Sequence, residues 1–148
     1  MRSDILDEIL NKNKVTASVY RGCHPCDHIP IFETPYAVIV NTDDSQEPGE
    51  HWVLLYVTDI VEYFDSFGRN WNSKLYPKEF IAYMKRFVNG RKTKYNPKIV
   101  ESLLGNCCGE YCAFYLYRRC QNVKNILSPF GANLKYNDLL VIEFVKHM

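Results

Sequence analysis

The spacing of apolar residues changes along the first half of this chain, from a helical period to an extended one. Apolar residues from Ile5 to Leu10 recur at helical spacing behind Ser3, which can cap a helix. Three β-rich runs follow, and each predicts a strand. They cover residues 36–42, 51–57 and 60–65. Because only Thr58-Asp59 separates the last two, we expect those strands to pair antiparallel.

The second half returns to the helical period. Pro77 suits the first turn of a helix that Asn89-Gly90 ends. An apolar run from Cys108 to about Gln121 predicts a buried helix, and Asn137-Asp138 is expected to start a last one. We therefore predict an α+β fold in a single domain, residues 1–148, with a mixed or antiparallel central sheet flanked by helices.

Three connecting segments lack a clear apolar period. Residues 15–20 alternate weakly, so they form either a brief strand or irregular structure, and residues 43–50 predict a turn-forming loop. Residues 21–35 predict a loop, although Cys23-His24-Pro25-Cys26 within it has the spacing of a redox motif. With His28 the motif offers three zinc ligands where a structural site needs four. An ordinary loop is favoured, and redox and zinc functions stay as alternatives.

Composition narrows the class of protein. The chain has 148 residues, of which 47% are hydrophobic and 24% charged, and a net charge of +1 argues against a general nucleic-acid binder. No apolar run is long enough to span a bilayer, and the first residues open a polar helix rather than a signal peptide. Six cysteines are therefore expected to be reduced. One segment carries basic residues and no acid: Lys85, Arg86, Arg91, Lys92, Lys94 and Lys98. This basic segment can contact a polyanion, although a solvated loop is the simpler interpretation.

Cys108 combines several features of a nucleophile. A helix N-terminus favours the ionised form of a thiol, and the thiolate is the reactive species. The backbone N–H of Cys108 can point toward an oxyanion formed by attack of its own sulfur. Gly109 would let a substrate backbone approach closely. A buried structural cysteine is the alternative.

His51 and Asp65 stand at the start and the end of the two paired strands, so a hairpin brings both to one edge of the sheet. There a carboxylate can orient an imidazole, which can then activate a thiol. The register decides whether they meet. A two-residue loop at 58–59 puts His51 opposite Ser66, whereas a three-residue loop at 57–59, or a bulge, puts it opposite Asp65.

Three blocks resemble the motifs of adenovirus-protease-like cysteine peptidases, especially those of virophages and Polinton/Maverick elements. The blocks are residues 48–52 (PGEHW), 63–68 (YFDSFG) and 108–112 (CGEYC), with VIVNT at 38–42 before them. The resemblance implies a triad of Cys108, His51 and Asp65. Cys107 lacks the following glycine, so Cys108 is the expected nucleophile. Trp52 and Gly109 are candidates for the substrate cleft.

The chain departs from the family at one position. The family carries a glutamine before the nucleophile, whose amide donates to the oxyanion, and the matching residue here is Glu101. An ionised carboxylate accepts hydrogen bonds but cannot donate one. We expect either a protonated Glu101, or one turned away with Asn106 or Ser102 donating. If Glu101 lies in the oxyanion region, Glu101→Gln should raise turnover.

The resemblance also implies a function. It indicates a cysteine endopeptidase that processes viral or transposon capsid precursors near glycine, inside the host cell or the virion. It further allows an activating peptide, and it implies no metal or organic cofactor and no membrane partner. Two alternatives remain open: a protease for SUMO or ubiquitin-like modifiers, and a protease-like interaction or zinc-binding module.

Overall fold

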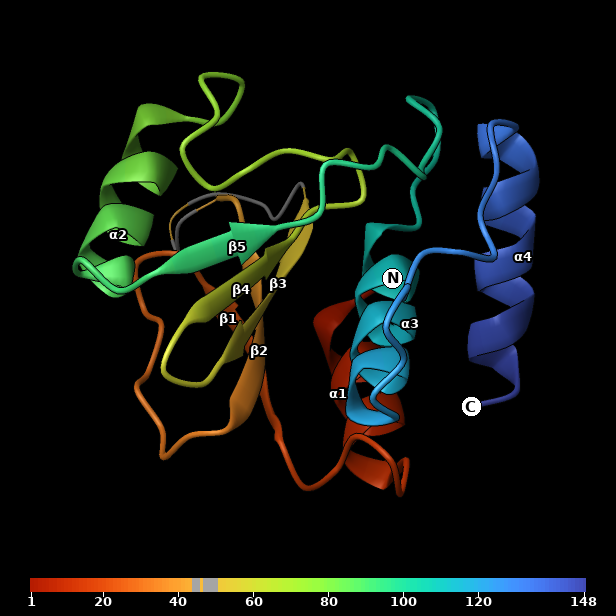
Figure 1. Cartoon of the computed structure of the whole chain (residues 1–148), viewed down its shortest axis with the longest axis horizontal. Helices are drawn as coiled ribbons and strands as arrows, with labels where there is room; N and C mark the ends of the chain where they lie inside the picture. Colours follow the sequence, from red (N-terminus) through yellow and green to blue (C-terminus); the bar gives the residue numbers. More distant parts are fainter. Residues whose placement is uncertain (44–45, 47–50) are drawn as a thin grey trace.

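The computed structural model describes residues 1–43, 46 and 51–148, and these form an α+β fold with a mixed sheet, as the sequence predicts (Figure 1). Most of the predicted loop 43–50 lies outside the described residues. The helices are α1 (Ser3–Lys12), α2 (Lys78–Val88), α3 (Cys108–Cys120) and α4 (Leu134–Lys146). The strands are β1 (Tyr20–Pro25), β2 (Tyr36–Asn41), β3 (Trp52–Val57), β4 (Val61–Phe64) and β5 (Thr93–Tyr95).

The strands lie in the sheet in their order along the chain, from β1 to β5. The three central strands are antiparallel, as the short connection between β3 and β4 requires, whereas β1 and β5 add to the two edges in parallel. The two edge strands, β1 and β5, are less buried than the three central strands.

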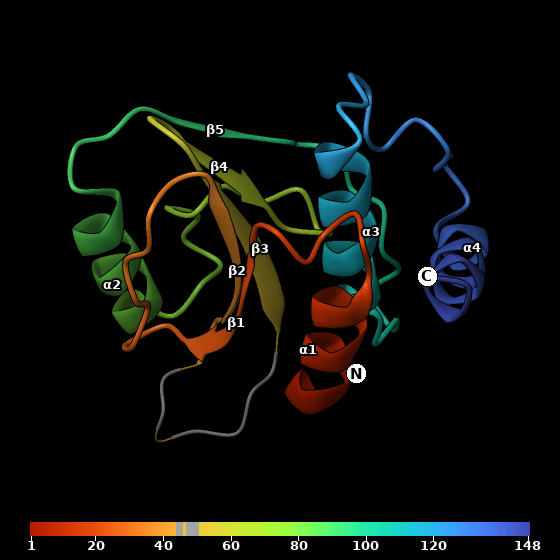
Figure 2. The same cartoon turned by 90° about the horizontal axis from the view of Figure 1, so that it is seen from below.

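The helices cover both faces of the sheet, which explains why the central strands are almost uniformly apolar. In β2, Ala37 and Ile39 face the core shared with α1, α3 and α4, while Val38 and Val40 face the core under α2. Figures 1 and 2 show α2 on one side of the sheet, α1 and α3 on the other, and α4 outside α3. Helix α3 is thus enclosed, and its residues from Cys108 to Leu116 are all buried.

Strand β1 corrects the loop predicted for residues 21–35. The strand pairs with β2, and its register shifts between Tyr20 and Cys23, where Gly22 has a φ of +94°. Only its first residue is buried, so this edge strand lacks the apolar alternation by which a strand is recognised. The residues before it form turns rather than a strand.

The helix starts correct two further expectations. Helix α4 begins at Leu134, not at Asn137-Asp138, because the side chain of Asn133 caps it by accepting from the N–H of Tyr136 at 3.1 Å. Asn137 and Asp138 lie inside the helix and are buried, whereas the next residue, Leu139, is 66% exposed. Ser3 is the first residue of α1 rather than its cap.

We expect the core beneath α2 to contribute substantially to stability. Met84 is fully buried in α2, so Met84→Ala should lower the free energy of unfolding by about 2–5 kcal/mol through lost burial and a cavity. Ile31→Ala is the control, because Ile31 is 81% exposed and its truncation should change stability by less than about 0.5 kcal/mol. Urea titration of both variants measures this, and equal effects would mean that α2 does not pack as described.

Candidate active site

The structure brings His51, Asp65 and Cys108 together from three separate elements. His51 immediately precedes β3, Asp65 follows β4, and Cys108 begins α3. The Nε2 atom of His51 lies 2.9 Å from Oδ1 of Asp65. The backbone N–H of Trp52 donates to the sulfur of Cys108 at 3.4 Å, so the thiol lies beside the residue that follows the histidine. The arrangement places a thiol, an imidazole and a carboxylate at one end of the central strands β3 and β4.

Neither of the two expected registers is the one observed. Val57 pairs with Val61 and Leu54 with Phe64, so the turn comprises residues 58–60. Continued past the strand ends, this register puts Asp65 beside Val53 rather than beside His51. His51 and Asp65 are then diagonal neighbours on one face of the sheet, a separation that long side chains can bridge. The two side chains meet because both are on the same face, not because they stand opposite each other.

The Asp65 carboxylate is completely buried, and hydrogen-bond donors surround it. Oδ1 accepts from His51 and from the N–H of Phe67 at 2.7 Å, and Oδ2 accepts from the hydroxyl of Tyr76. Burial alone would raise the pKa of Asp65. The hydrogen bonds from His51, Tyr76 and the N–H of Phe67, together with the charge of His51, outweigh burial and lower that pKa. Asp65 therefore stays ionised and can orient His51.

The same contacts keep a proton on His51. Burial opposes the charged form, but hydrogen bonds to Asp65 and Cys108 outweigh it and raise the pKa of His51 to about 10. Because Nε2 bonds to Asp65, Nδ1 is the nitrogen left for the thiol. The ring of Phe67 stacks on the imidazole with centroids 5.1 Å apart. The sequence does not reveal the role of Tyr76, because nothing in the order of residues marks a tyrosine eleven positions from Asp65 as its partner.

The environments of the two adjacent cysteines differ. Burial, followed by the charges of Glu101 and Asp138, raises the pKa of Cys107, which disfavours its thiolate. Cys108 instead receives a hydrogen bond from a backbone N–H and lies beside the protonated His51. Both Cys107 and Cys108 are free thiols. The surroundings therefore favour Cys108 over Cys107 as the reactive thiol.

Glu101 faces inward and uses both of its oxygens. Oε1 accepts from the hydroxyl of Ser66 at 2.5 Å, and Oε2 accepts from the N–H of Cys107 at 3.0 Å. Burial raises the pKa of Glu101, and these two hydrogen bonds oppose that rise. The hydroxyl of Ser102 is also engaged, because it donates to Asp138 at 2.7 Å. Glu101 thus joins the segment after Asp65 to the segment before Cys108.

The structure gives the two cleft candidates different surroundings. The indole N–H of Trp52 donates to the backbone oxygen of Met1 at 3.4 Å, so its ring lies against the N-terminal residue. A Cβ atom added to Gly109 would lie 3.1 Å from Leu6 and 3.4 Å from Met1. The absence of a side chain at Gly109 therefore allows Leu6 of α1 to pack closely against α3.

The Cys23 motif begins in the edge strand β1. Cys23 lies in β1, where burial raises its pKa to about 12, and its sulfur is 3.1 Å from the hydroxyl of Tyr20. Among the described residues, no group of three or more His, Cys, Asp or Glu side chains is arranged to hold a metal ion. None of the described helices has the length and apolarity that a membrane crossing requires.

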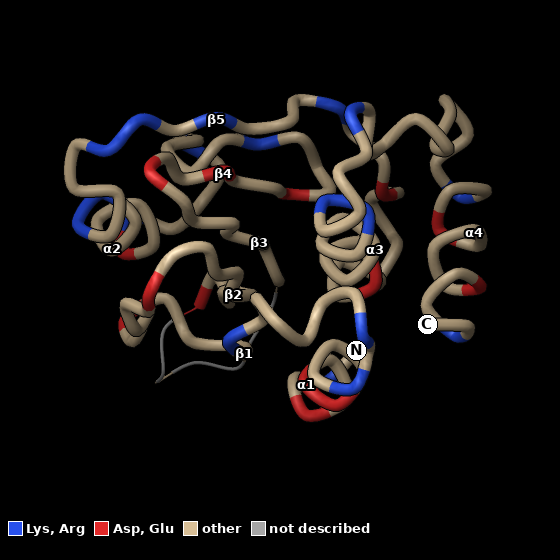
Figure 3. Tube along the Cα trace, turned by 60° about the horizontal axis from the view of Figure 1, so that its bottom comes forward, with Lys and Arg blue, Asp and Glu red and all other residues tan. Residues whose placement is uncertain are grey.

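The basic segment follows the β5 edge of the molecule (Figure 3). Arg91 is engaged with the end of α2, where it donates to the backbone oxygens of Phe87 and Val88, and Lys98 donates to backbone oxygens of residues 127 and 130. The remaining members are exposed: Lys85, Arg86, Lys92 and Lys94. Lys98 is exposed as well, but its ammonium group is engaged in those two contacts.

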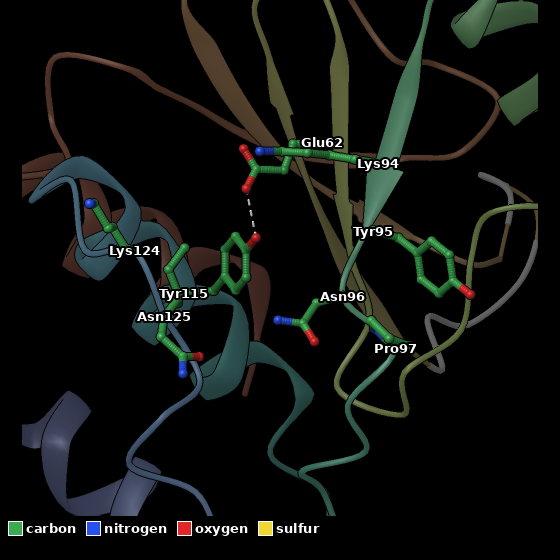
Figure 4. A pocket seen from close by; sticks show the side chains of 9 residues that line it. Glu62, Lys94, Tyr95, Asn96, Pro97, Tyr115, Lys124 and Asn125 are labelled. Carbon is green, nitrogen blue, oxygen red and sulfur yellow. Dashed lines mark hydrogen bonds between the residues drawn. The ribbon is translucent and has the colours of Figure 1, made fainter.

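A separate polar pocket of about 290 Å³ lies between β4, β5 and α3, and none of the three candidate catalytic residues lines it (Figure 4). Glu62 in this pocket accepts from Tyr115 at 2.7 Å and from Arg119 at 2.9 Å, so both carboxylate oxygens are paired. The pocket therefore contains the contact by which α3 is attached to β4.

Comparisons with known proteins give similarities only among solved structures. No protein-family model matches the chain, and no curated protein matches it. Among solved structures, the chain is similar to the crystal structure of the ASFV pS273R protease, with 24% sequence identity and a TM-score of 0.44. The similarity covers 72% of this chain and 42% of that chain, so this chain matches less than half the length of that protein.

Replacing Asp65 should change the titration of His51. Asp65→Asn keeps an oxygen that can accept from His51 but removes the negative charge that favours the protonated imidazole, so the pKa of His51 should fall from about 10 toward or below its ordinary value. In the parent, the proton held by His51 stabilises the folded state fully below about pH 6.5, and this contribution is lost as the pH rises toward 10. Titration of the imidazole by NMR measures the shift. Asp59→Asn, in the exposed turn, is the matched control and should leave the pKa unchanged; a pKa unchanged in Asp65→Asn would contradict the pairing.

Glu101→Gln separates the charge of Glu101 from its hydrogen bonds. The amide can still accept from Cys107 and can donate to Ser66, but the negative charge beside the start of α3 disappears. We expect peptide turnover at pH 7 to rise roughly threefold to tenfold, because that charge opposes a thiolate and an oxyanion nearby. Glu101→Leu removes both hydrogen bonds and should instead lose about 1–3 kcal/mol of stability. Unchanged or lower turnover in Glu101→Gln would show that the site does not experience this charge.

Proposed function

We propose that this protein is a cysteine endopeptidase that uses Cys108, His51 and Asp65. The observation that carries the proposal is the hydrogen bond of His51 to a buried, ionised carboxylate while its ring lies beside a thiol at the start of a buried helix. This arrangement meets the requirements of nucleophilic catalysis, in which a third group orients the base that serves the nucleophile.

Each residue then has a role in peptide cleavage. The sulfur of Cys108, as thiolate, attacks the scissile carbonyl carbon and forms a C–S bond. The proton on His51 passes to the leaving amine as the C–N bond breaks, which leaves an acyl-enzyme. Neutral His51 next takes a proton from water, whose oxygen displaces the sulfur and releases the acid. Asp65 holds the imidazole in orientation throughout.

The negative oxygen of the tetrahedral intermediate needs donors. The first N–H groups of a helix have no acceptor within the helix, so the N–H of Cys108 is suited to this role. The carboxylate of Glu101 accepts hydrogen bonds from two neighbours, and the hydroxyl of Ser102 donates to Asp138. Asn106 has an exposed side chain in the segment before Cys108, so we assign the second donor to its amide.

The substrate is a polypeptide, and we propose capsid precursors of a virus or transposon, cleaved inside the host cell or the virion. The preference for glycine rests on the sequence resemblance alone, because α1 occupies the space in front of Gly109. An activating peptide and a weak polyanion contact through the exposed members of the basic segment belong to the same proposal.

The first test of this function compares the two adjacent cysteines. Cys108→Ala and His51→Ala should each lower peptide cleavage by at least about a thousandfold, because nucleophile or base is lost. Cys107→Ala is the matched control and should keep its activity, since the environment of Cys107 disfavours its thiolate. Cleavage is measured on a panel of glycine-containing peptides, capsid proteins, and SUMO and ubiquitin fusions.

The outcomes separate the alternatives. Full activity in Cys108→Ala would refute the proposed nucleophile, and loss in Cys107→Ala with an intact fold would move it by one residue. Cleavage of the modifier fusions alone would favour a protease for ubiquitin-like modifiers. A folded parent that cleaves nothing on the panel and resists a peptide-directed thiol probe would favour an interaction module.

A further inference from the structure

Two tyrosine hydroxyls lie behind Asp65, on the side away from His51, and the cleavage mechanism above makes no use of them. The hydroxyl of Tyr76 donates to Oδ2 of Asp65, and the hydroxyl of Tyr63 donates to that of Tyr76 at 2.9 Å. Tyr63 belongs to β4, whereas Tyr76 lies just before α2. The two hydroxyls thus form a chain of donors that ends on Oδ2 of Asp65, whose other oxygen binds His51.

The protein encloses this chain of donors. Tyr63 and Asp65 are fully buried and Tyr76 nearly so. Burial, with the nearby negative charge of Asp65, raises the pKa of both tyrosines, so their hydroxyls keep their protons and remain donors. Donors in series polarise one another, which strengthens the last hydrogen bond, the one to the carboxylate.

The ring of Tyr76 is itself held in place. It packs on Phe80 of α2 with ring centroids 4.7 Å apart, and the guanidinium of Arg69 lies 5.6 Å from its centroid. The same guanidinium lies 5.1 Å from the ring of Phe67, which stacks on His51. The segment that follows Asp65 therefore contacts both members of the His51–Asp65 pair. Phe67 stacks on the ring of His51, and Tyr76 donates to Oδ2 of Asp65.

We propose that Tyr76 is a positioning residue of the active site, which acts through Asp65, and that Tyr63 fixes the direction of the Tyr76 hydroxyl. The inference rests on the proposed function. Asp65 has one oxygen toward His51 and one toward Tyr76, so the two contacts together set the rotation of the carboxylate. Without Tyr76, Oδ2 would be buried without the hydroxyl donor observed here, and the carboxylate would turn to find another. His51 would then lose the partner that aims its ring at Cys108.

A purely structural role is the competing explanation, and the chain offers a matched control for it. Tyr115 also donates to a buried carboxylate, Glu62, at 2.7 Å, but this pair lies in the pocket of Figure 4 and not at the active site. Tyr76→Phe and Tyr115→Phe are the same chemical change in similar surroundings. Both should lower stability, whereas only the first should alter His51.

The deciding measurement is the exchange rate of the His51 Nε2–H proton with water, observed by NMR on the protein without substrate. We expect Tyr76→Phe to speed this exchange about tenfold, because a looser carboxylate releases the proton more often. Tyr63→Phe should have a smaller effect, since Tyr76 can still donate. Tyr115→Phe should have none. Equal exchange rates in the parent and Tyr76→Phe would overturn the inference, and if that variant does not fold, Tyr63→Phe decides in the same way.

Kinetics provide the second measurement. Tyr76→Phe should lower kcat about tenfold and leave KM unchanged, because the hydroxyl does not reach the substrate. In an Asp65→Asn background the same change should have almost no effect, since Tyr76 acts through that carboxylate. Additive losses would overturn the inference. A parent without peptidase activity would refute the proposed function, while the NMR exchange rates would still decide the role of Tyr76.

Discussion

A carboxylate buried away from water must be paired with donors from the protein, and Asp65 imposes that requirement on everything around it. Its two oxygens take hydrogen bonds from His51, from the backbone at Phe67 and from Tyr76. These donors come from the residue before β3, from the turn after β4 and from the segment that leads into α2. The position of the imidazole is therefore fixed by the same contacts that satisfy the charge.

Two further buried carboxylates fix α3 against β4. Glu62 of β4 accepts from Tyr115 and Arg119 of α3. Glu101 accepts from Ser66 just beyond β4 and from Cys107 at the start of α3. Because these contacts lie along the length of the helix, its first turn is held at the end of the central strands where His51 lies. The position of the thiol depends on this attachment as much as on the helix itself.

The differences between expectation and structure share a physical cause, which is polar side chains serving tertiary contacts. Asn137 and Asp138 have the composition of a helix start, yet they are buried inside α4, where they bond to residues 100, 102, 111 and 131. The two oxygens of Glu101 likewise serve tertiary contacts, because they accept from Ser66 and from the N–H of Cys107. Helix and turn propensities are local properties, so they carry no information about hydrogen-bond partners that lie far away in the sequence.

The sequence by itself determined the α+β class, the central helix from Cys108 and the antiparallel pairing of β3 with β4, because apolar period and turn length are local properties. It also supplied the three residues of the proposed triad through their motifs. Only the tertiary structure decided the register that makes His51 and Asp65 diagonal neighbours, the side of Gly109 that α1 occupies, and the hydroxyls of Tyr63 and Tyr76 behind the carboxylate. Each of these depends on groups from separate elements that come within bonding distance only when the sheet and α3 pack together.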